Sequence, residues 1–192
     1  MFAKRLLFVA SIAVLAACGG GSEGGDDSTT TPRPEPVGAL AKYVGNYSYC
    51  DQDNTRYSLT LTNAGDDSLN ALPTEVTYQN DNCTGNVLGT YTWSAPAKLT
   101  LTSTGVATVR GDGLPASLTV DKVQLTATNV RIVVSGAAAT GNCINYPNGQ
   151  VCYEQLPSNA TTLGALYLSG GKLYEMLLEN GVYFVEDVYT KN

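Results

Sequence analysis

Apolar and polar residues alternate with a period of two along much of the chain between residues 57 and 134. Tyr57, Leu59 and Leu61 are separated by single hydroxyl residues. The same spacing recurs at residues 76–78, 91–93, 99–101, 118–120, 123–127 and 130–134. Successive side chains of a β-strand point to opposite faces, so this pattern predicts strands with one buried face. Residues 38–192 contain no sustained apolar repeat of 3.6 residues, and the chain is therefore predicted to be all-β.

Residues typical of turns interrupt this alternation at short intervals. Asn180-Gly181 joins residues 172–179 to residues 182–188 and suits a type I′ hairpin, which needs positive φ at both central positions. Ser169-Gly170-Gly171 joins residues 165–168 to 172–179, so three strands form a meander. Other predicted breaks fall at residues 63–66, 111–113, 121–122 and 128–129. About ten strands with such short connections imply antiparallel neighbours.

Two architectures could close these strands, an up-and-down barrel or a two-sheet sandwich. Tyr43-Val44-Gly45-Asn46-Tyr47 resembles the Gly-x-Trp start of lipocalin and avidin-like barrels, with Tyr47 in place of the tryptophan. The arginine that partners this tryptophan near the last lipocalin strand has no counterpart here. The resemblance favours the barrel, and the sandwich stays open.

The N-terminus has the layout of an export signal. Lys4 and Arg5 precede an apolar run over residues 6–17 that is too short to cross a bilayer as a helix. Leu15-Ala16-Ala17-Cys18 resembles the lipobox of bacterial lipoproteins. That resemblance implies that residues 1–17 are cleaved and that Cys18 carries the acyl chains that hold the protein on membrane lipid.

The residues after Cys18 are expected to tether a single all-β domain, residues 38–192. Glycines in the first half of residues 18–37 and prolines in the second half are typical of a linker. Gly19 takes the place where an aspartate commonly retains Gram-negative lipoproteins at the inner membrane. The resemblance thus favours the outer membrane and leaves open whether the domain faces the periplasm or the cell surface.

The net charge and the absence of histidine exclude several classes of function for the predicted exported chain. Cleavage would remove Lys4 and Arg5 from the 11 Lys and Arg and none of the 17 Asp and Glu, which leaves a net charge of −8. Such an acidic chain is a poor partner for nucleic acid. The chain has no histidine, so Ser–His–Asp and Cys–His catalysis and most zinc sites are excluded. We therefore expect neither an enzyme, a metal nor a cofactor.

Four cysteines follow Cys18, an even number that predicts two disulfides in an exported chain. Three pairings are possible. We favour Cys50–Cys83 and Cys143–Cys152, because the second pair flanks the turn-rich residues 145–149. Loop closure would contribute about 3 kcal/mol for the short loop and about 4 kcal/mol for the long one.

Carboxylates offer the main catalytic alternative. A pair of them could serve a hydrolase acting on cell-wall or glycan material. The candidates are Glu75, Glu154, Glu175, Glu179 and Glu186, and the sequence does not place any two of them together. Ser169 and Lys172 match the S-x-x-K pattern of penicillin-binding proteins, but they lie in a predicted hairpin without the companion motifs.

Tyrosine dominates the aromatic residues, with 12 Tyr against 3 Phe and 1 Trp. A tyrosine ring is apolar and its tip is polar, which suits half-buried strands and binding surfaces alike. The aromatic residues that could line a barrel mouth or a sandwich face are Tyr47, Tyr49, Tyr57, Tyr78, Tyr91 and Trp93. The alternative is ordinary cross-strand packing.

Taken together, the sequence leads us to expect a non-enzymatic lipoprotein of the cell envelope whose β-domain binds an envelope protein or a small ligand. Two other functions stay open: the carboxylate hydrolase, and a structural component of an outer-membrane assembly.

Overall fold

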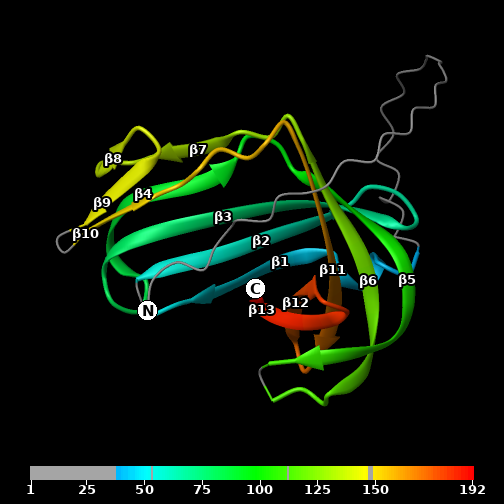
Figure 1. Ribbon diagram of the computed structural model, residues 1–192. Coiled ribbons are helices and arrows are strands. Elements are labelled where there is room, and N and C mark those ends of the chain that lie inside the picture. Colours follow the sequence, from blue (N-terminus) through cyan, green and yellow to red (C-terminus); the bar gives the residue numbers. More distant parts are fainter. Residues whose placement is uncertain (1–37, 53, 112, 147–148) are drawn as a thin grey trace, which may run out of the picture. The chain divides into compact units, whose positions relative to one another are not determined.

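The computed structural model describes residues 38–52, 54–111, 113–146 and 149–192. These residues form thirteen strands and one short 3₁₀ helix, η1 (Figure 1). The elements are η1 (Ala41–Tyr43), β1 (Gly45–Cys50), β2 (Thr55–Asn63), β3 (Ser68–Asn80), β4 (Thr84–Trp93), β5 (Ala97–Arg110), β6 (Ser117–Thr128), β7 (Ile132–Ser135), β8 (Ala139–Thr140), β9 (Cys143–Tyr146), β10 (Gly149–Cys152), β11 (Asn159–Ser169), β12 (Lys172–Glu179) and β13 (Val182–Lys191).

Eight strands close a ring in chain order. The ring runs β1-β2-β3-β5-β6-β11-β12-β13 and returns to β1, with each neighbour antiparallel to the next. The return is short, since β13 meets β1 through the pairs Tyr47↔Lys191 and Ser48↔Thr190. The predicted all-β, antiparallel fold is therefore confirmed, and its order around the ring is up-and-down.

The ring is not a clean barrel, because β3 also pairs with a strand outside it and two ring strands that are not neighbours, β5 and β13, also pair. The first part of β3 (Ser68 to Ala71) pairs with β5, whereas its later part pairs with β4, which carries β7 away from the ring. β8, β9 and β10 form a separate small sheet near β4 (Figure 1). In addition, the start of β13 runs parallel to the end of β5 at Tyr183↔Val109.

The first core fills the ring, and every ring strand contributes to it. Its buried residues are Leu40, Tyr43, Tyr47, Leu59, Leu61, Leu69, Ala71, Leu99, Val123, Leu166, Leu173 and Tyr189. We call the strand face that carries these residues the inner face. Burial of each large side chain contributes about 1.5–3 kcal/mol. Leu40 and Tyr43 come from the η1 segment, so this segment is held by the core that the strands enclose.

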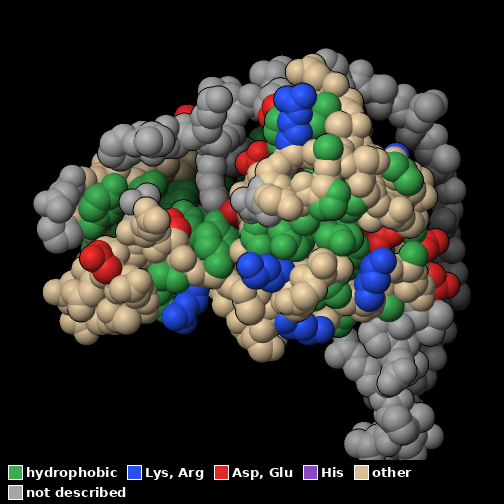
Figure 2. Space-filling model, turned by 90° about the horizontal axis from the view of Figure 1, so that it is seen from below, with side chains coloured by type: hydrophobic (Ala, Val, Ile, Leu, Met, Phe, Trp, Pro, Cys, Tyr) green, Lys and Arg blue, Asp and Glu red, His purple; other side chains and the backbone are tan. Residues whose placement is uncertain are grey.

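A second core lies on the other side of β11–β13. It consists of Ala107, Val109, Val120, Ala165, Met176 and Tyr183. Leu166 belongs to the first core and its neighbour Ala165 to the second, as the alternation of a strand requires. Bulges that insert Thr102 into β5 and Glu186 into β13 shift the alternation of these two strands, so that each serves both cores. Seen from below, Figure 2 shows hydrophobic side chains on this face of the molecule, with separate Lys and Arg side chains among them.

Both predicted disulfides are present. Cys50–Cys83 ties the end of β1 to the turn between β3 and β4. Cys143–Cys152 joins directly opposite residues of β9 and β10. The predicted signal peptide, the predicted lipidation site Cys18 and the whole of the predicted linker, residues 18–37, lie outside the described residues.

The local predictions hold with one exception. The meander of β11, β12 and β13 is confirmed, and Asn180 and Gly181 have φ of 49° and 81°. The predicted break at residues 121–122 is wrong, because β6 runs from Ser117 to Thr128 without interruption. Aspartate is typical of turns, but Asp121 is buried within a strand, where its carboxylate accepts a hydrogen bond from Tyr43, a residue distant in sequence.

Candidate functional site

A row of tyrosines crosses the inner face. Strand register places Tyr49 opposite Tyr57, Tyr57 opposite Glu75, and Glu75 opposite Tyr91. Directly opposite residues of antiparallel strands lie on the same face. Leu59 and Leu61 of the first core alternate with the same period as Tyr57, so the row continues the inner face beyond the core.

The rings within the row touch one another. Tyr49 stacks on Tyr57 with centroids 5.0 Å apart, and Tyr189 meets Tyr49 edge-on at 5.2 Å. Both geometries are favoured arrangements of aromatic pairs. Tyr49 and Tyr57 are half-buried, whereas Tyr189 is buried. The row therefore combines ring surface that is fixed by packing with ring surface that reaches solvent.

Tyr153 completes the row from a segment that lies outside the eight-stranded ring. It follows β10 directly, and its ring stacks on Tyr91 at 4.3 Å. Its hydroxyl donates to Glu75 Oε2 at 3.2 Å. Burial, together with the negative charge and hydrogen bond of Glu75, raises the pKa of the Tyr153 hydroxyl, so it stays a proton donor at neutral pH. We call Tyr49, Tyr57, Tyr91, Tyr153 and Tyr189 the tyrosine row.

The small sheet holds Tyr153 in this position. Ile144 of β9 is fully buried against Gly89 of β4, where an added Cβ would lie 2.8 Å from Ile144 Cγ1. Gly89 is opposite Thr77 and lies two residues before Tyr91, so Ile144 covers the inner face next to the row. The Tyr153 amide donates to Asn142 O at 3.0 Å, across the hairpin closed by Cys143–Cys152.

Carboxylates lie at two places along the row. Asp187 of β13 accepts hydrogen bonds from the hydroxyls of Tyr49 and Tyr189. Glu175 of β12 lies directly opposite Asp187 in the strand register. Glu75 lies on β3, where it accepts from Tyr153. All three carboxylate residues are half-buried.

The structure sorts the aromatic candidates of the sequence into three places. Tyr49, Tyr57 and Tyr91 belong to the row, and Trp93 joins it by donating from Nε1 to the Tyr91 hydroxyl at 2.6 Å. Tyr47 is fully buried in the first core. Tyr78 lies one residue from buried Thr77 and so points to the opposite face, where the Arg56 guanidinium lies 5.3 Å from its ring.

The sequence missed three residues of the site. Tyr189 and Asp187 share a face of β13, but nothing in the sequence shows that this strand returns to β1. Tyr153 lies in no strand and therefore carries no periodic pattern. Of the other carboxylate candidates, Glu154 follows β10, Glu179 ends β12 and Glu186 is exposed on β13.

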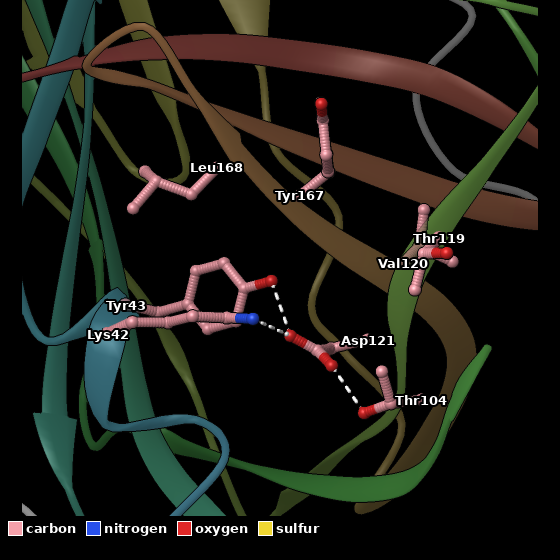
Figure 3. A pocket seen from close by; sticks show the side chains of 8 residues that line it. All are labelled: Lys42, Tyr43, Thr104, Thr119, Val120, Asp121, Tyr167 and Leu168. Carbon is pink, nitrogen blue, oxygen red and sulfur yellow. Dashed lines mark hydrogen bonds and ion pairs between the residues drawn. The ribbon is translucent and has the colours of Figure 1, made fainter. Parts of the chain in front are cut away.

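A separate polar cluster surrounds Asp121 (Figure 3). The Asp121 carboxylate forms an ion pair with Lys42 Nζ at 2.7 Å, and Thr104 Oγ1 donates to it at 2.5 Å. The Tyr43 hydroxyl lies 2.7 Å from Asp121 Oδ2 and 2.9 Å from the Leu166 carbonyl oxygen. Burial alone would raise the pKa of Asp121, but hydrogen bonds from Lys42, Thr104 and Tyr43 outweigh it and lower this pKa.

The pocket beside Asp121 is small, with a volume of about 160 Å³. Pockets that bind small organic ligands usually enclose about 300–1,000 Å³. The carboxylate is already surrounded by three donors: Lys42 and Tyr43 belong to η1, and Thr104 belongs to β5. This cluster therefore fastens the η1 segment and β5 to β6, at the place where the two cores meet.

Comparison of the chain with protein-family models, with curated proteins and with solved structures finds no match. Within the described part of the chain, no helix is long and apolar enough to span a membrane. Among the same residues, no three His, Cys, Asp or Glu side chains are grouped so that they could hold a metal ion.

Proposed function

We propose that this protein is a cell-envelope lipoprotein, anchored through an acylated Cys18, whose β-domain binds a small ligand on the tyrosine row. The observation that carries the ligand-binding part is the row itself: five tyrosines from four ring or neighbouring strands and one loop converge on one face. The lipobox-like residues 15–18 support the anchor.

The chemistry of the row suits binding better than catalysis. Tyrosine rings provide rigid apolar surface at a low entropic cost, and their hydroxyls orient polar groups of a ligand. Asp187 and Glu75 hold the hydroxyls of Tyr49, Tyr189 and Tyr153, which fixes the rings before a ligand arrives. Preorganised rings lose less entropy on binding than mobile ones.

One observation favours a second candidate, the carboxylate hydrolase. Glu175 and Asp187 face each other across β12 and β13, and directly opposite residues have Cβ atoms about 5 Å apart. Two such carboxylates could divide acid and base roles. Hydrolysis of cell-wall glycan that disappears in Glu175→Gln, while the row still binds ligand, would support this function over binding alone.

The binding proposal is tested by fluorine NMR of protein labelled with 3-fluorotyrosine. Each resonance is assigned with single Tyr→Phe variants, and aqueous and lipid extracts of cell envelopes are added. We expect the resonances of Tyr49, Tyr57 and Tyr153 to shift. Tyr174, a half-buried strand tyrosine of the second core paired with Tyr167 at 5.8 Å, is the matched control.

A Tyr57→Leu variant should abolish the shifts at the neighbouring row positions, whereas Tyr174→Leu should leave them unchanged. Extracts that move no row resonance, or that move Tyr174 as much as Tyr57, would contradict the proposal.

A further inference from the structure

The three strands of the small sheet form a body of their own. β8, β9 and β10 pair with one another, and among the described residues none of them pairs with a strand of the ten-stranded sheet (Figure 1). At the two ends of the small sheet, the Ala138 amide donates to the Leu88 carbonyl oxygen at 2.9 Å and the Tyr153 hydroxyl donates to Glu75. Packing and single hydrogen bonds, rather than a strand ladder, therefore hold the small sheet to the large one.

Contacts inside the small sheet tie it into one unit. The disulfide joins β9 to β10, and the side chain of Asn145 links all three strands. Its Nδ2 donates to the Ala138 carbonyl oxygen at 3.0 Å and to Thr140 Oγ1 at 3.1 Å, and its Oδ1 accepts from Gln150 Nε2 at 2.7 Å. The Tyr153 amide is bonded to the loop between β8 and β9. A displacement of any one of these strands therefore carries the others and Tyr153 with it.

Both connections of this unit to the rest of the chain run beside β7. The chain enters through Gly136, directly after β7 ends at Ser135, and Gly136 has a φ of 124°, which glycine adopts readily. The chain leaves at Tyr153 and is fixed again at Gln155, whose side-chain amide bonds to the backbone N–H and carbonyl of Ile132 at 2.9 and 3.0 Å. Ile132 and Ser135 are the two ends of β7, about 10 Å apart. Two connections at the ends of one strand define an axis about which the unit can turn.

In this structure the unit closes one part of the tyrosine row. Ile144 is 0% exposed and fills the space over Gly89, and Tyr91 is only 8% exposed beneath the Tyr153 ring. Units that are held by few buried apolar contacts open at a lower cost in free energy than the whole fold. Any molecule that contacts the face of the Tyr91 ring requires this unit to move.

Resting on the proposed function of the row, we infer that β8, β9, β10 and Tyr153 form a lid, which opens as one unit about β7 and admits ligand to Tyr91. Ile144 is the plug of the closed lid. The disulfide lies within the lid and does not join it to the ring, so it stays intact during opening. Opening leaves Tyr49 and Tyr57 in place on the ring strands. The lid thus divides the row into a fixed part and a part to which access is regulated.

Hydrogen exchange of the full chain tests the opening. Amides of β8, β9 and β10 that are bonded within the small sheet should exchange at one common rate, about tenfold or more faster than those of β2 and β6. Gly89→Ala places a Cβ 2.8–2.9 Å from three side-chain atoms of Ile144, and it should raise the lid rate about tenfold further. Gly105→Ala is the matched control, because this strand glycine of β5 has no atom within 4 Å of an added Cβ. It should leave the lid rate unchanged.

A double variant separates the plug from a general loss of stability. Ile144→Ala removes the plug and should by itself raise the lid rate about tenfold or more. Adding Gly89→Ala to Ile144→Ala should change the rate by no more than about twofold, because the added Cβ no longer meets the larger side chain. Equal lid rates in Gly89→Ala and Gly105→Ala, or full additivity in the double variant, would overturn the lid.

Admission of ligand is tested by stopped flow after mixing with envelope extract. The emission of Trp93, which donates to Tyr91, should change faster in Gly89→Ala than in Gly105→Ala, and equal rates would overturn the regulation of access. Lid amides that exchange no faster than those of β2, or at rates unrelated to one another, would overturn the lid. If extracts then still moved the row resonances, the proposed function would stand without it. A lid that opens as a unit, with extracts that move no row resonance, would remove the proposed function and the admission of ligand with it.

Discussion

Replacing Asp121 by asparagine tests whether the cluster in Figure 3 fastens the two cores together. Asparagine has the same shape but no charge, and its amide group cannot accept from all three donors. Lys42 is 54% exposed and returns to water, so its ion pair contributes little. The Tyr43 hydroxyl keeps the Leu166 carbonyl oxygen as an acceptor.

The remaining loss is the difference between charged and neutral hydrogen bonds at Tyr43 and Thr104. Hydrogen bonds to charged groups contribute about 1 kcal/mol more than neutral ones, so we expect Asp121→Asn to lower the free energy of unfolding by about 2 kcal/mol at pH 7. Urea unfolding, followed by circular dichroism, measures this change. Tyr43→Phe removes one donor and keeps the buried ring, and it should cost about 1 kcal/mol.

The contribution of Asp121 to the free energy of unfolding depends on pH with a definite sign. The pKa of Asp121 is lower in the folded protein than in the unfolded chain, where it is about 3.9. The ionised carboxylate therefore stabilises the fold above the unfolded value, and this stability is lost as the pH falls through the folded value. The difference in free energy of unfolding between the original protein and Asp121→Asn should therefore decrease below about pH 4. A variant as stable as the original at pH 7, or a gap that widens in acid, would refute this reasoning.

Three further predictions concern other parts of the chain. Tyr153→Ala should shift the emission of the single tryptophan, Trp93, because it removes the ring stacked on the Tyr91 that Trp93 contacts; unchanged emission would contradict this. Gly136→Ala should lower the free energy of unfolding in urea by more than about 2 kcal/mol, since the added Cβ would lie 2.6 Å from the Cα of Gly89. The added Cβ of Gly170→Ala meets open space, so this variant should lose only about 1 kcal/mol. Equal losses in the two variants would argue against the close approach at Gly136. Cys18→Ser should move the protein from membrane to soluble fractions and remove the lipid mass, and continued membrane retention would count against the anchor.

Local features of the fold were predictable because they depend on residues close in sequence. The alternation at Tyr57, Leu59 and Leu61 is produced by the pleat of one strand. The Asn180-Gly181 turn follows from the φ values that it requires, and the Cys143–Cys152 pairing follows from a short turn-rich loop.

Features that depend on register between distant strands were not predictable. Asp121 has the appearance of a turn residue, but Tyr43, 78 positions away, satisfies it inside a strand. The candidate site shows the same division. Three of its five tyrosines were identifiable from the sequence. Tyr153 and Tyr189 join the row only through the docking of the small sheet and the return of β13 to β1.

The most direct test of a ligand-binding tyrosine row is footprinting of the protein as purified from envelopes, with its bound compounds retained and then washed out. Oxidative labelling, read by mass spectrometry, should rise at Tyr49, Tyr57 and Tyr153 once the compounds are removed, while Tyr174 stays constant. Labelling that is the same in both samples, or that changes equally at all four residues, would contradict the account.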